Sequence, residues 1–174
     1  HNVLGENFYK VTVQVKRDSG VNDEIPVIVS ERLIECDHNY FYDYVAIIGQ
    51  FRSHNTHVGG ARKLLLFVFA KSFDVVDPED INDVYLEGTI NDKPTYRRTP
   101  LGREICDIKL KVSRGYGKSD YLPCIFWGDM ARFVNGLKVG DSIRVGGRLQ
   151  SRTYKECMTA YEVSVSLVEV IGVL

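Results

Sequence analysis

The sequence predicts an all-β protein that contains two tandem copies of one small fold. Two observations lead to this prediction. Apolar and polar residues alternate along much of the chain, which is the pattern of strands with one buried face. The chain also repeats itself at an offset of about 97 residues, from Leu4 in the first copy and Leu101 in the second. Such a repeat within 174 residues favours two small domains over one larger domain.

The repeat runs without a gap when residues 4–30 are set over residues 101–127. A spacer of one residue later brings 49–53 onto 147–151. The identical pairs in the first stretch are Leu4/Leu101, Gly5/Gly102, Val15/Val112, Arg17/Arg114, Gly20/Gly117, Asp23/Asp120, Pro26/Pro123 and Ile28/Ile125. We expect the first copy to occupy residues 1–74, the second to occupy 83–174, and the acidic segment 75–82 to link them.

The first copy is expected to begin with a hairpin and to end with two further strands. Its first strand is marked by Val11, Val13 and Val15, which alternate with polar residues. A turn at 18–20 leads to a second strand at 25–30. The segment 34–43 is polar and aromatic and favours no helix, and strands at 44–52 and 64–73 complete the copy.

The second copy has the same hairpin, with an additional strand before it and a helix after it. The opening strand is expected at 84–90, and the hairpin strands are marked by Ile108, Leu110 and Val112 and by residues 121–127. A helix is expected from Asp129 to Asn135, with Met130, Phe133 and Val134 on one side. Asp129 is expected to cap its start and Gly136 its end. Strands at 142–151 and 159–170 follow, joined by a hairpin tip at 152–156.

Five strands with a short helix between the third and the fourth follow the order of an OB-fold, a small Greek-key barrel. The sequence therefore predicts two tandem OB-fold barrels. The first copy shows no opening strand after His1, so either that strand lies outside this chain or the first barrel is open at one edge. An open strand edge promotes association unless another chain covers it.

Composition excludes several classes of protein. The sequence contains no run of 18 apolar residues that could span a membrane, and no signal peptide is visible. We therefore expect a cytoplasmic protein. The four cysteines form no CxxC pair, the histidines lack a third ligand at metal spacing, and no catalytic set appears, so we expect no metal, no cofactor and no enzyme. Residues 1–80 carry 8 Lys/Arg and 12 Asp/Glu, whereas 81–174 carry 14 and 11, so a polyanion should prefer the second copy.

Five blocks of the second copy carry a resemblance to a known family. They lie in order at 82–88, 94–102, 121–128, 138–141 and 145–152. Together they resemble the bacterial single-stranded DNA-binding protein family, over about residues 82–171. The resemblance implies an OB-fold that binds single-stranded DNA largely by stacking bases on aromatic side chains. The positions that match the family's aromatics are Tyr116, Tyr121, Trp127 and Tyr154.

The residue pattern agrees with this implication. Tyr121 and Trp127 lie six residues apart in one strand, so they share a face about 20 Å long. Rings interleaved with cations suit sequence-tolerant binding, because every base can stack and every phosphate is an anion. The cations that could line this track are Arg97, Arg98, Arg103, Lys109, Lys111, Arg114, Lys118, Arg148, Arg152 and Lys155. In place of Tyr116, Tyr121 and Trp127 the first copy has Ser19, Glu24 and Ser30, so we expect it to bind weakly or not at all.

The leading interpretation is a protein that coats single-stranded DNA without base specificity in replication, recombination or repair. Two alternatives stay open: a primosome-accessory or RNA-binding barrel, and an OB pair that binds other proteins instead of nucleic acid. Most relatives have one barrel per chain and form tetramers, so two of these chains are expected to form a four-barrel homodimer. The acidic tail by which the family recruits partners is not seen before Leu174, so we expect no tail-mediated partners.

Overall fold

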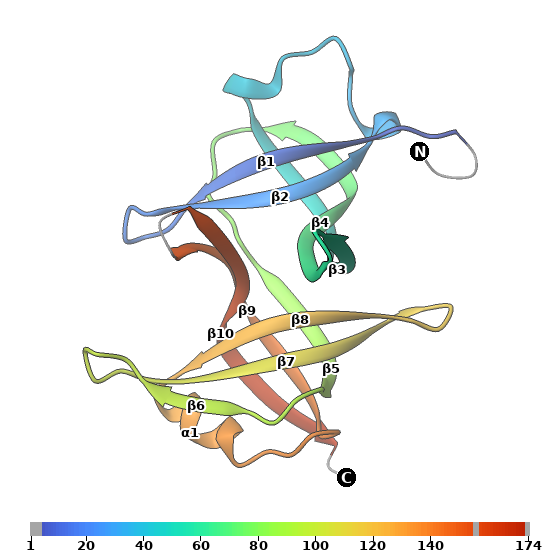
Figure 1. Ribbon diagram of the computed structural model, residues 1–174. Helices are drawn as coiled ribbons and strands as arrows, with labels where there is room; N and C mark the ends of the chain where they lie inside the picture. Colours follow the sequence, from blue (N-terminus) through green and yellow to red (C-terminus); the bar gives the residue numbers. More distant parts are fainter. Residues whose placement is uncertain (1–4, 155–156, 173–174) are drawn as a thin grey trace. The chain divides into compact units, whose positions relative to one another are not determined.

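The computed structural model describes residues 5–154 and 157–172, and the chain divides into two compact units. Unit 1 comprises His1–Ile81 and unit 2 comprises Asn82–Leu174. Both are built from β-strands, and the described residues contain one α-helix, in unit 2 (Figure 1). The predicted all-β class is therefore confirmed. Leu4, where the repeat begins, and His1 lie outside the described residues.

Unit 2 is a closed barrel with one additional strand beside it. Its strands are β5 (Val84–Ile90), β6 (Thr95–Arg98), β7 (Glu104–Gly115), β8 (Lys118–Trp127), β9 (Ser142–Tyr154) and β10 (Met158–Gly172). They pair in the order β5-β9-β10-β8-β7-β6, and β5 also pairs with β7. This last pairing closes five strands into a barrel. The short β6, which the sequence pattern did not predict, pairs with β7 outside the closed ring.

Alternation along β8 determines which side chains fill this barrel. Leu122, Cys124 and Phe126 are buried, as their parity predicts, and Leu110 of β7 lies opposite Leu122 in the interior. Burying a Leu or Phe side chain fully contributes about 1.5–3 kcal/mol to folding. The core of unit 2 therefore holds β7 and β8 in one register and fixes the face that the intervening residues present outward.

The helix α1 (Asp129–Asn135) has the bounds that the sequence predicts, but its cap and its buried face differ. The N-cap residue is Gly128, at φ 57°, and no side chain caps the helix start, so the predicted Asp129 cap is wrong. Ala131 and Val134 face the core, whereas Phe133 is exposed. Of the three residues expected on one side of the helix, only Val134 is buried, because a helix of two turns buries only a narrow stripe.

Unit 1 is a four-stranded sheet. Its strands are β1 (Phe8–Lys16), β2 (Asn22–Ser30), β3 (Tyr44–Val58) and β4 (Ala61–Val76), and they pair in the order β1-β2-β4-β3. Two 3-10 turns, η1 (Glu31–Leu33) and η2 (Tyr40–Tyr42), connect β2 to β3, where the sequence favoured no helix. β4 continues through Val76, two residues into the segment expected to be a linker.

The two units share strand order and register. The order β1-β2-β4-β3 corresponds to β7-β8-β10-β9, and β2 and β4 are parallel, as are β8 and β10. Lys10 lies opposite Ile28, as Asp107 lies opposite Ile125 at the repeat offset. A bulge also recurs at one place, next to Gly49 in β3 and next to Gly147 in β9. The repeat seen in the sequence is thus a repeat of backbone structure.

The core of unit 1 is much less enclosed than that of unit 2. Its buried apolar side chains are Ile25, Val27, Val29 and Ala70. The alternating valines of β1 are only half-buried. Residues 5–81 contain no counterpart of β5, so the edges of β1 and β3 do not meet through a fifth strand.

Candidate nucleic-acid interface

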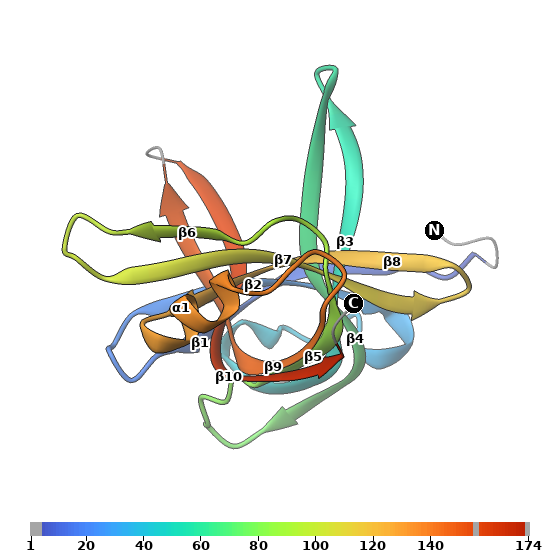
Figure 2. The same cartoon turned by 90° about the horizontal axis from the view of Figure 1, so that it is seen from below.

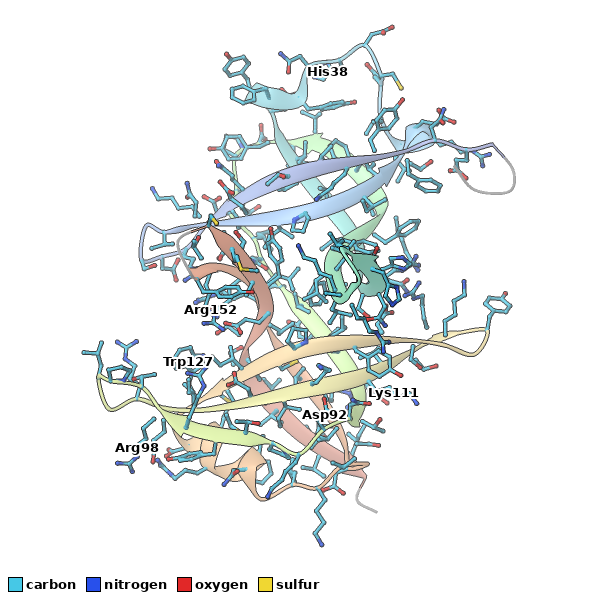
Figure 3. The ribbon with its side chains drawn as sticks, in the orientation of Figure 1. His38, Asp92, Arg98, Lys111, Trp127 and Arg152 are labelled. Carbon is cyan, nitrogen blue, oxygen red and sulfur yellow. The ribbon has the colours of Figure 1, made fainter. Side chains whose placement is uncertain are left out.

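The outward face of the β7–β8 hairpin carries the predicted rings of β8 and two of the predicted lysines. Lys111 lies opposite Tyr121, and Lys109 lies opposite Pro123. Residues directly opposite each other in an antiparallel pair point to the same face. Tyr121 and Trp127 therefore share this face with both lysines, and Trp127 and Lys111 lie near opposite ends of it (Figure 3).

Trp127 and Tyr121 point away from the core and are half-buried. The indole N–H of Trp127 donates a hydrogen bond to Ser164 Oγ of β10, at 3.3 Å. This bond orients the indole ring. Ile125, which has the same parity, is buried, so the face is not open along its whole length.

Tyr154 extends the same face onto β9. Ser164 of β10 neighbours Ile125 of β8 and lies opposite Arg148 of β9, so Arg148 stands on the outward face. Arg152 and Tyr154 follow at even spacing and share that side of β9. The side chain of Tyr154 is 38% exposed, and its neighbour Arg152 is also exposed (Figure 3).

Tyr116 occupies the tip of the β7–β8 hairpin and is fully exposed. It has a φ of 50°, the left-handed region, between two glycines that also have positive φ. Among the described residues it is the only non-glycine with positive φ. Left-handed backbone at a large L-residue is costly and is commonly found at functional sites.

Several of the predicted cations are already paired with carboxylates. Arg97 lies 2.9 Å from Asp107, and Lys109 lies 3.6 Å from Asp92. All four side chains are substantially exposed. Exposed ion pairs contribute only about 0–1 kcal/mol, so a phosphate can replace the carboxylate at little cost. Within the described part of the chain, Lys111 and Lys118 make no ion pair.

Arg114 differs from these, because its partner is buried. Its guanidinium bonds Asp120 through two nitrogens, at 2.9 and 2.5 Å, and Asp120 is buried. Arg17 and Asp23 make the same two-point contact in unit 1, at 2.7 and 2.5 Å. The pair thus gives Arg114 a structural role, because its guanidinium satisfies a buried carboxylate and secures the hairpin turn.

Arg98 does not lie with the other cations. It is opposite Glu104 in the β6–β7 pair, on the side of Tyr96 and Cys106, whereas Arg97 lies on the outward side (Figure 3). Glu104 binds Arg98 at 3.2 Å and also binds Arg132 of α1. Arg98 therefore lies on the opposite side of β6 from Arg97, because adjacent residues in a strand point to opposite faces, and its contact with DNA stays a prediction.

The remaining predicted cations lie at strand ends. Arg103 is exposed in the turn between β6 and β7, and Lys118 begins β8 after the tip that carries Tyr116. Lys155 lies outside the described residues.

Sequence reasoning missed a buried acid within this face. Glu162 of β10 is buried, accepts a hydrogen bond from the Gln150 amide at 2.8 Å, and lies 3.3 Å from Arg152. It fixes the position of Arg152 between Tyr154 and the centre of the face. Its period-two spacing with Ser164 was the only signal in the sequence.

Two thiols lie behind the same face. Burial raises the pKa of Cys106 to about 11, and burial also raises the pKa of Cys124, with a smaller contribution from the charge of Glu162. Both are therefore protonated at neutral pH and behave as small apolar side chains. All four cysteines are free, and Cys36 and Cys157 are exposed.

Comparison with known proteins places this geometry in context. A family model described as the single-strand binding protein family matches residues 81–171. Single-stranded DNA-binding protein A of Bacillus subtilis is 35% identical over 82 residues, which cover 43% of this chain and 48% of that protein. Single-stranded DNA-binding protein 1 of Staphylococcus aureus is also 35% identical over 82 residues, covering 43% and 49%. The chain thus spans about half the length of the curated relatives it matches.

Solved structures match both units. The wild-type single-stranded DNA binding protein from Thermus aquaticus aligns with a TM-score of 0.75 and 20% identity, over 95% of this chain and 80% of that chain. A deletion mutant of that protein aligns with a TM-score of 0.71 and 21% identity. At this identity the likeness concerns the fold alone. Separately, no helix among the described residues is long and apolar enough to cross a membrane.

Proposed function

Because the chain belongs to the single-strand binding protein family, we propose that it binds single-stranded DNA without base specificity, in replication, recombination or repair. Bases stack on Tyr116, Tyr121, Trp127 and Tyr154, and phosphates contact the cations between them. The observation that carries this proposal is the common outward face of Tyr121, Trp127 and Tyr154. Strands β7, β8 and β9 present these rings together with Lys109, Lys111 and Arg152, and β10 lies between β8 and β9.

The same proposal includes the architecture of the whole chain. Two OB-fold domains, 1–74 and 83–174, are joined by the segment 75–82, and the described residues of the first domain contain no counterpart of β5. The shared strand order and the recurring bulge support this reading. The protein acts as a binding protein in the cytoplasm rather than as an enzyme.

Two chains are proposed to assemble into a homodimer with four barrels. Support comes from the segment before β3, where Phe41 and Tyr42 are 81% and 84% exposed and their rings meet edge to face at 4.9 Å. Exposed aromatic pairs of this kind are enriched at protein interfaces. Sedimentation equilibrium at micromolar concentration should give twice the chain mass, and a single-chain mass contradicts the dimer.

Titration with an oligothymidylate tests the stacking proposal. Trp127 is the only tryptophan, so its fluorescence reports directly on the proposed face, and quenching at low salt is expected. Affinity for a labelled oligonucleotide, followed by anisotropy, should fall about 5- to 150-fold in Trp127→Ala or Tyr154→Ala, since one stacked base is worth about 1–3 kcal/mol.

Phe133→Ala is the matched control, because Phe133 is an exposed ring on α1, outside the strands that carry the proposed face. It should bind like the wild type. Equal loss in all three variants, or no quenching at low salt, contradicts the stacking proposal and favours a protein-binding role. Competition with a matched RNA oligonucleotide separates DNA binding from RNA binding.

A further inference from the structure

The outward face of unit 1 carries aromatic rings in a different place from unit 2. Val27 pairs with Val68 in unit 1 as Cys124 pairs with Val163 in unit 2. One residue further along each strand, Phe69 therefore occupies the place of Ser164.

Ser30, at the repeat offset, occupies the place of Trp127. Unit 2 has a large ring on β8 and a small side chain on β10. Unit 1 has a small side chain on β2 and a large ring on β4. The large ring of this face thus lies on β8 in unit 2 but on β4 in unit 1, where β4 is the neighbour of β2.

A second difference between β4 and β10 also places an aromatic side chain on the outward face of unit 1. Phe67 lies opposite Arg52 in unit 1, at the position where Glu162 lies opposite Gln150 in unit 2. Unit 1 therefore has an aromatic side chain where unit 2 has a buried acid. Phe67 and Phe69 are both half-buried, so part of each ring reaches the surface. The next outward residue of β4, Leu65, is exposed.

A cation already lies on one of these rings. The guanidinium carbon of Arg52 is 4.0 Å from the centroid of the Phe69 ring, and an Arg52 nitrogen donates to Gln50 Oε1 at 2.7 Å. Phe8 of β1 packs against the other side of this group, 5.8 Å from Phe69 between centroids. A planar guanidinium held over an aromatic ring is a stacking platform for a base.

The charge of the β3–β4 hairpin also suits a polyanion. Unit 1 is acidic as a whole, but residues 44–73 contain no Asp or Glu. They contain Arg52, Arg62, Lys63, Lys71 and two histidines. The hairpin extends well beyond the rest of its own sheet, with Arg62 and Lys63 next to its tip (Figure 2). A protruding basic arm attracts phosphates even though the domain carries net negative charge.

We propose that the β3–β4 hairpin of unit 1 is a second binding surface for single-stranded nucleic acid, with Phe67, Phe69 and Arg52 as its stacking group and the basic tip as its phosphate contact. The proposal rests on the proposed function of unit 2, because it assumes that the corresponding face of unit 1 also binds nucleic acid by base stacking and phosphate contact. It revises the expectation of weak or no binding, which rested on the rings lost from residues 4–30 and on the acidic balance of the first copy and took no account of β4.

Calorimetric titration of the full chain with the ten-nucleotide oligothymidylate dT10 at low salt tests the proposal. An OB-fold covers about 4–16 nucleotides, so one dT10 can fill one unit. Two binding events per chain are expected. Trp127→Ala with Tyr154→Ala should remove the tighter event, and Phe67→Leu with Phe69→Leu should weaken the other about tenfold or more, since leucine fills the site but offers no ring.

Matched controls separate stacking and charge from general damage to the fold. Phe133→Leu changes an exposed ring on α1 and should alter neither event. Lys63→Glu should weaken the second event and make its salt dependence shallower, whereas Lys138→Glu, in an exposed loop of unit 2, should not.

The possible failures are distinguishable. One event per chain, unchanged in the Phe67→Leu/Phe69→Leu and Lys63→Glu variants, overturns the second surface and leaves the proposed function intact. Absence of any binding by the wild type overturns the proposed function itself.

Discussion

Replacing Tyr116 by asparagine is expected to stabilise the protein and to weaken its binding of DNA. Tyr116 has a φ of 50° and its side chain is fully exposed, so the folded state gains little packing from the ring. Left-handed backbone costs an ordinary L-residue about 1–2 kcal/mol, whereas asparagine adopts it readily. We therefore expect the free energy of unfolding to rise by about 1 kcal/mol, which raises the melting temperature of a domain of this size by about 4–8 °C.

Binding should change in the opposite direction. If one base stacks on Tyr116, its loss should weaken affinity about 5- to 150-fold, corresponding to about 1–3 kcal/mol. Thermal unfolding by circular dichroism and anisotropy with a labelled oligothymidylate measure the two effects. Tyr116→Phe is the control, since it keeps both the ring and the backbone strain and should leave both values near wild type. Unchanged affinity in Tyr116→Asn refutes the stacking role, and lower stability refutes the argument from strain.

Three further predictions concern the framework of unit 2. Arg114→Ala should lower the free energy of unfolding by about 3–5 kcal/mol in chemical denaturation, because it removes the guanidinium that pairs with the buried carboxylate of Asp120; a loss under about 1 kcal/mol contradicts this. Gly147→Ala should prevent stable folding, visible as lost circular dichroism, since the new Cβ would lie 2.1 Å from a backbone oxygen of β10. Cys106, with its pKa raised to about 11, should resist iodoacetamide at pH 8 while Cys36 reacts, with mass spectrometry as the readout.

Local patterns were sufficient to predict the strands that build the core. In β8 the buried set Leu122, Cys124 and Phe126 follows the period of two, because each side chain faces either the interior or the outside. The four residues of β6 were missed, because a strand that short shows no period. The spacing in α1 put Phe133 on one side with Val134, but only Val134 is buried, because burial in a short helix depends on what packs beside it.

The candidate site was predictable in its rings and less so in its charges. Whether a cation meets a carboxylate depends on pairing between strands, as for Arg97 of β6 and Asp107 of β7. The sequence did contain a sign that Arg114 has a structural partner. The first copy keeps the equivalent Arg17 and Asp23, although it has no rings at the positions of the second copy's stacking residues. Both copies share what the turn needs and differ in what a ligand contacts.

The recurring arginine–aspartate pair makes the two hairpins exchangeable modules. Residues 18–24 and 115–121 each bring their own buried aspartate, and Asp23 lies opposite Val15 as Asp120 lies opposite Val112 at the repeat offset. Transplanting the second segment into the first copy would carry Tyr116 and Tyr121 across while leaving an arginine–aspartate clasp in place. The chain thus contains its own template for re-engineering a diverged half.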